Sequence, residues 1–93
     1  MVKVALHPDA RAEYRAAWTW YRARSKQAAG RFRDEFDRVI EIIKSNPALF
    51  PVYEGDIRYA GLARFPYSVI YQVQPAFIYV IAVAHSARSE GYW

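Results

Sequence analysis

One segment decides the fold: residues 67–84, with the sequence YSVIYQVQPAFIYVIAVA. Two runs rich in aromatic and β-branched residues, 67–73 and 77–84, flank the short connection QPA. Runs of this length and composition are typical of buried strands, and a three-residue connection joins two strands as an antiparallel hairpin. The sequence therefore predicts a central β-hairpin in the C-terminal third of the chain.

Two helices are predicted upstream of this hairpin. The first spans Pro8–Arg24, because proline suits the first position of a helix and an acidic residue follows it. The second spans Ala28–Ser45 and has the clearest periodicity in the chain. Its apolar residues recur at helical spacing, at Phe32, Phe36, Val39, Ile40 and Ile43. We expect the two helices to form an antiparallel hairpin that buries this stripe against a sheet.

The remaining elements complete an α+β fold. A short strand is predicted at Val2–Leu6, another at Ile57–Ala63, and a loop over residues 47–56. The expected order is β-α-α-β-β-β, with the N-terminal strand and the helical hairpin packed on a mainly antiparallel sheet. We expect residues 1–93 to form a single domain.

Composition excludes several classes of protein. The chain has no cysteine, which excludes disulfides and thiolate metal sites and fits a reducing compartment. The first apolar run is too short for a signal peptide, and no run approaches the ~18 apolar residues of a membrane span. We therefore expect a soluble, cytoplasmic protein without a membrane partner.

The net charge of +4 is unevenly distributed. Between residues 22 and 33 the chain carries five basic side chains and no acidic one: Arg22, Arg24, Lys26, Arg31 and Arg33. Such a stretch favours contact with nucleic acid or with an acidic protein. The alternative is a solvated turn between two helices without a binding role.

Motifs for cofactors and metals are weak. The only histidines are His7 and His85, no acidic cluster has metal-ligand spacing, and the four glycines form no phosphate-binding loop. His7 precedes a proline and is expected to be a helix cap or a surface residue. We expect no metal ion and no cofactor.

Polar and aromatic residues that could handle RNA gather mainly near the C-terminus. The candidates are Arg58, Arg64, His85, Arg88, Tyr92 and Trp93. Metal-free RNA cleavage needs a base, an acid and cations around the phosphate. His85 could transfer protons, the arginines could hold phosphate, and Tyr92 or Trp93 could stack on a base. Alternatively, His85 is a hydrogen-bonded strand end, the arginines are solvated, and the two aromatic residues cap the core.

Three segments carry a family resemblance: Asn46–Pro51 (NPALFP), Arg64–Val73 (RFPYSVIYQV) and Ala82–Arg88 (AVAHSAR), followed by the ending GYW. Together they resemble the RelE/ParE superfamily of bacterial toxins, often labelled plasmid stabilisation proteins. The resemblance implies one half of a type II toxin–antitoxin system. It also implies a small antitoxin as partner and contact with operator DNA only through that antitoxin.

The resemblance leaves the cellular target open. ParE-like members poison DNA gyrase, whereas RelE-like members are mRNA interferases that cut mRNA on the ribosome. RelE-like nucleases commonly carry arginine where this chain has Ser68, and basic residues in the region of Ser86. We therefore favour a gyrase poison. A nuclease using His85, Tyr92 and Arg64, with Arg58, Arg88 and Trp93 binding RNA, is the alternative. A third hypothesis is a member that binds its antitoxin without toxicity.

Overall fold

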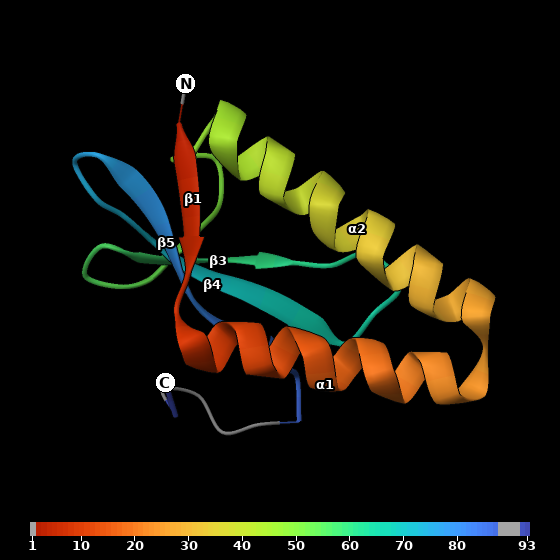
Figure 1. Ribbon diagram of the computed structural model, residues 1–93. Helices are drawn as coiled ribbons and strands as arrows, with labels where there is room; N and C mark the ends of the chain where they lie inside the picture. Colours follow the sequence, from red (N-terminus) through yellow and green to blue (C-terminus); the bar gives the residue numbers. More distant parts are fainter. Residues whose placement is uncertain (1, 88–91) are drawn as a thin grey trace.

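A five-stranded sheet with two helices over one face forms the core of the chain (Figure 1). The computed structural model describes residues 2–87 and 92–93. In chain order the elements are β1 (Lys3–Leu6), α1 (Pro8–Arg24), α2 (Lys26–Ser45), β2 (Val52–Glu54), β3 (Ile57–Gly61), β4 (Tyr67–Val73) and β5 (Phe77–His85). This architecture confirms the predicted α+β class and the central hairpin.

The strands lie in the order β1-β5-β4-β3-β2. Only β1 and β5 pair in parallel, and the other neighbours are antiparallel. A parallel pair needs a long crossover connection between its two strands. Here both helices and the strands β2, β3 and β4 lie between β1 and β5 in the chain. Neither helix of the described residues has the length and apolar character needed to cross a bilayer.

A single serine joins the two helices. The backbone N–H of Ser25 donates to Tyr21 at 2.8 Å and closes α1. Its hydroxyl accepts the N–H of Ala28 at 3.2 Å and caps α2. Because one residue serves both helix ends, α2 begins at Lys26, two residues earlier than predicted. At the start of α1, His7 acts as the expected cap, with Nδ1 accepting the N–H of Asp9 at 3.0 Å.

The main core lies between the helices and the sheet. The predicted stripe of α2 is buried there, with Phe32, Val39 and Ile43 at most 1% exposed. The ring of Phe32 contacts four other rings, those of Tyr14, Tyr21, Phe65 and Tyr67, at centroid distances of 5.3 to 5.5 Å. Apolar burial of this extent is the main force that holds the helical hairpin on the sheet.

The segment 47–56, predicted as a loop, contains the short edge strand β2. Three residues are too few to show a periodicity, and β2 exists because it pairs with β3. Two long side chains anchor the loop before it. The Tyr71 hydroxyl donates to the carbonyl of Pro47 at 2.6 Å, and Arg58 donates to that of Phe50 at 2.6 Å.

A β-bulge in β5 decides which side chains face the helices. Ile70 of β4 is opposite Ala82 while Tyr71 is opposite Val80, so Ile81 is the extra residue. Val80 packs in the main core, whereas Ile81 and Ala82 both contact a small cluster on the other face. Alternation then resumes, which returns Val83 to the helix side.

Candidate functional site

A cavity of about 480 Å³ lies on the sheet face away from the helices. Its lining includes Tyr53, Tyr59, Ser68, His85, Ser86 and Trp93. Ser68 reaches this face because side chains alternate along β4 and its neighbours Tyr67 and Val69 pack toward the helices. The Trp93 ring lies 5.2 Å from the Tyr53 ring and packs against the small apolar cluster beneath. We call this hollow the open-face cavity.

A second cavity, of about 440 Å³, lies between α1 and the end of β5. Its lining includes Glu13, Trp20, Tyr67, His85 and Tyr92. We call it the α1-side cavity. His85 borders both cavities. Among the described residues, neither of the other two predicted catalytic residues, Tyr92 and Arg64, does so.

His85 is held by two contacts. Its ring lies 4.9 Å from that of Tyr67, edge to face, and its Nδ1 accepts the backbone N–H of Ala87 at 3.0 Å. A ring nitrogen that accepts a hydrogen bond carries no proton, so the neutral ring bears its proton on Nε2. Acting at Nε2 as a base, or as an imidazolium acid, requires a proton on Nδ1 and therefore loss of the Ala87 bond. Burial raises the pKa of the neighbouring Tyr67 hydroxyl, which stays protonated at neutral pH.

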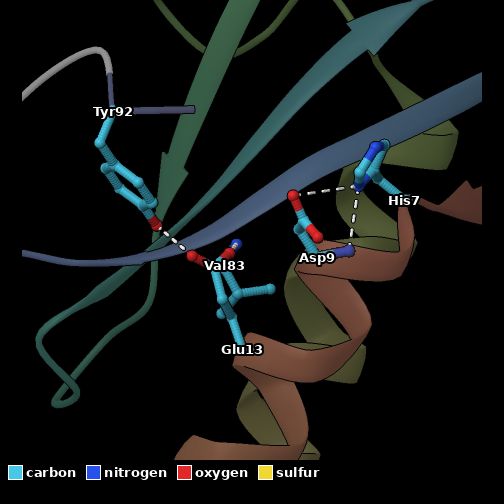
Figure 2. A network of polar contacts seen from close by, with 5 residues as sticks. All are labelled: His7, Asp9, Glu13, Val83 and Tyr92. Atoms are coloured by element: carbon cyan, nitrogen blue, oxygen red, sulfur yellow. Dashed lines mark hydrogen bonds and ion pairs between the residues drawn. The ribbon is translucent and has the colours of Figure 1, made fainter.

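Glu13 of α1 joins the end of the chain to β5 (Figure 2). Its Oε1 accepts the backbone N–H of Val83 at 2.8 Å, and its Oε2 accepts the Tyr92 hydroxyl at 2.5 Å. Strand β1 pairs with β5 only as far as Val80, so the carboxylate supplies an acceptor beyond the end of β1. Sequence reasoning missed Glu13. Glu13 lies three residues after the buried Ala10 and four before the buried Ala17, so helical spacing places it on the face of α1 that packs on the sheet. That spacing was the available signal.

Two of the predicted arginines, Arg58 and Arg64, lie away from His85. Arg58 points to the loop before β2, where it donates to two backbone carbonyls. Arg64 lies in the turn between β3 and β4, beside a different cavity that Arg31, Glu35 and Arg38 also line. Arg88 lies outside the described residues. The structure thus brings His85 and Tyr92 to one cavity and His85 and Trp93 to the other, without Arg58 or Arg64 at either.

Ser68 and Ser86 both line the open-face cavity. Ser68 is on β4, and Ser86 follows β5, where its N–H donates to the carbonyl of Pro66 at 2.8 Å. Among the described residues, the cavity lining contains no lysine, arginine, aspartate or glutamate side chain. Throughout residues 2–87 and 92–93, no group of three or more His, Cys, Asp and Glu side chains is placed to hold a metal ion.

Comparisons with known proteins identify a family and a related fold. The family model for the ParE toxin of type II toxin–antitoxin system, parDE, matches residues 4–90. A solved structure titled "Chromosomal ParDE TA system from P. aeruginosa" has a TM-score of 0.64 and 16% sequence identity, covering 91% of this chain and 96% of that chain. This likeness shows a shared fold. No curated protein matches in sequence. The match over nearly its whole length places the chain in the ParE toxin family of type II toxin–antitoxin systems.

Proposed function

We propose that this toxin acts by binding and poisoning DNA gyrase, without cleaving RNA, and that a small cognate antitoxin neutralises it. The observation that carries the choice of target is that Ser68 and Ser86 line one cavity together. These are the positions at which the resemblance to RelE-like nucleases leads us to expect basic side chains. This function requires a cytoplasmic location, where gyrase acts on DNA.

Without guanidinium groups at these two positions, RNA cleavage at this cavity would have a higher activation free energy. A preorganised donor to a developing negative charge is worth about 2.7–4 kcal/mol, or roughly 10²–10³ in rate. Two absent donors would therefore lower a cleavage rate by about four to six orders of magnitude if the effects were additive. The Nδ1 bond of His85 to Ala87 adds to this, because proton transfer at Nε2 would require that bond to break.

The purified chain should be tested on both targets side by side. We expect it to inhibit supercoiling by DNA gyrase and to increase gyrase-linked DNA breaks, while mRNA translated on ribosomes remains uncut. His85→Ala should alter toxicity only modestly. Site-specific mRNA cleavage that depends on His85, with gyrase unaffected, would reject the proposal.

The nuclease alternative is favoured by one observation. His85 and Tyr92 line the same cavity beside α1, so a proton-transfer group and an aromatic ring do lie near each other. A nuclease at that place would have to bind phosphate next to the carboxylate of Glu13, which also lines it. Repulsion between the carboxylate and a phosphate makes this site the weaker candidate.

For the antitoxin we propose an acidic amphipathic segment across the helical hairpin. A hollow of about 680 Å³ runs between α1 and α2, with Leu6, Tyr14, Trp18 and Phe36 as its apolar part. Arg11 and Arg15 line it as well, with one acidic residue, Asp37, so the charged part of the lining is net positive. An apolar groove with basic residues beside it fits a helix with one apolar and one acidic face.

Charge reversal tests this placement. Arg11→Glu/Arg15→Glu should weaken antitoxin binding at least tenfold in titration calorimetry, because it replaces attraction to acidic residues with repulsion. Lys3→Glu/Lys44→Glu, with the same change in net charge, is the matched control. Equal losses in both variants would point to a general charge effect and reject the groove as the docking site.

A further inference from the structure

A group of cations without acidic partners surrounds the end of the molecule where the two helices meet. It consists of Arg22 and Arg24 at the end of α1, Lys26 and Arg31 at the start of α2, and Arg64 in the turn between β3 and β4. Within residues 2–87 and 92–93, no acidic side chain forms an ion pair with any of the five. We call this group the hairpin-end cations.

The helix junction and the β3–β4 turn are held together by the core. Phe65 of the turn packs against Tyr21 at the end of α1, at 5.1 Å, and against Phe32 of α2, at 5.4 Å. The backbone N–H of Ala63 also donates to the Glu35 carboxylate at 2.5 Å. Cations from three segments are therefore presented on one rigid support.

Among the described residues, the two acidic side chains that line the cavity beside Arg31 and Arg64 already pair with other arginines. Glu35 binds Arg38 through both oxygens, at 2.7 and 2.8 Å, and Asp34 lies 3.4 Å from Arg33. Arg31 and Arg64 line the same cavity of about 870 Å³ as these acids without pairing to them. Arg64 contributes with Arg38 to lowering the pKa of Glu35, but no ion pair among the described residues holds Arg31 or Arg64, so both guanidinium groups can contact a partner outside the chain.

Trp20, the exposed aromatic residue near these cations in the described part of the chain, is poorly suited to stack on nucleotide bases. Trp20 is half exposed, but the guanidinium of Arg24 lies over its ring at 3.5 Å and also donates to the Trp20 carbonyl at 3.0 Å. Binding of single strands relies on bases stacking on free aromatic faces. A surface that offers mainly cations suits the phosphates of an intact duplex.

We propose that the hairpin-end cations bind the phosphate backbone of double-stranded DNA directly, without sequence specificity. The proposal departs from the expectation that DNA is reached only through the antitoxin, and it is independent of the toxin's target.

Salt dependence of binding tests the proposal. The purified full chain is titrated into a fluorescent 20-base-pair duplex of mixed sequence at several salt concentrations. Four or five phosphate contacts predict a slope of log K against log salt of about −3.6 to −4.5. Arg31→Gln/Arg64→Gln should reduce the magnitude of this slope by about 1.8, because two contacts are lost.

The matched control removes two charges from the other end of the molecule. Lys3→Gln/Lys44→Gln alters β1 and the C-terminal end of α2, which Figure 1 shows far from the helix junction. This variant should keep the slope of the unmodified chain. Circular dichroism checks that both variants are folded, and Arg22→Gln/Lys26→Gln replaces the first variant if Arg64 proves necessary for folding.

Three results would overturn the proposal. The first is absence of duplex binding by the unmodified chain at 50 mM salt. The second is an equal change of slope in the test and control variants, which would mean that net charge alone is responsible. The third is tighter binding to polyglutamate or to a single-stranded 20-mer than to the duplex, which would assign the surface to an acidic protein or to single strands.

Discussion

Replacing Glu13 by alanine should destabilise the protein by about 2 kcal/mol. The substitution removes the acceptor for the part-buried N–H of Val83 and for the Tyr92 hydroxyl. A hydrogen bond to a charged group contributes about 1.5–3 kcal/mol, and an orphaned buried donor costs about 1–3 kcal/mol. The better helix propensity of alanine offsets a few tenths of a kcal/mol. For a domain of this size, 2 kcal/mol lowers the melting temperature by roughly 8–16 °C.

Two further substitutions separate the contributions of the hydrogen bonds that Glu13 accepts from Val83 and from Tyr92. Tyr92→Phe removes only the hydroxyl and keeps the ring that lies 5.2 Å from Trp93. It should cost about 0.5–1.5 kcal/mol. Glu13→Gln keeps an oxygen for Val83 and should cost less than Glu13→Ala. The double variant Glu13→Ala/Tyr92→Phe should cost less than the sum of the single variants, since the two residues share one bond.

Urea unfolding followed by circular dichroism measures these differences. A cost for Glu13→Ala below about 0.5 kcal/mol, the usual range for surface positions, would refute the reasoning. It would mean that water replaces the carboxylate at the N–H of Val83 without loss. Strict additivity in the double variant would likewise show that the Glu13–Tyr92 bond contributes nothing in solution.

Substitutions at three other positions test the fold. Phe32→Ala should cost about 3–5 kcal/mol in urea unfolding, because it removes a fully buried ring that contacts four others; a cost below about 1.5 kcal/mol would contradict the packing. The hydrogen bond from Arg38 lowers the pKa of Glu35 from 4.5, so its stabilisation is present above that pH and lost as pH falls through the folded-state pKa. The stability difference between the unmodified chain and Glu35→Gln should therefore shrink below pH 4.5, and a pH-independent difference would contradict this. Arg64 has φ of 69°, so Arg64→Gly should raise stability by about 0.5–1 kcal/mol while Arg64→Ala does not; a loss with glycine would show that the side chain stabilises the turn.

Local patterns predicted most of the fold. The stripe of α2 and the runs of β4 and β5 follow from residues a few positions apart, so a single sequence contains the information. The edge strand β2 and the extra residue Ile81 depend on pairing with neighbouring strands, which no local pattern encodes. Similarly, nearness in sequence suggested that His85, Tyr92 and Trp93 form one site. In the structure Tyr92 contacts α1 while Trp93 covers the opposite face of the sheet.

The extra residue Ile81 affects how roles can be inherited between relatives of this toxin. A gapless alignment across the last strand can equate two histidines whose rings lie on opposite sides of the sheet, if only one of the chains has the bulge. Insertion or loss of one residue at this point would exchange the surfaces offered by the end of the strand while leaving its sequence motif intact. Residue roles in this strand can therefore be transferred only between chains that share the bulge.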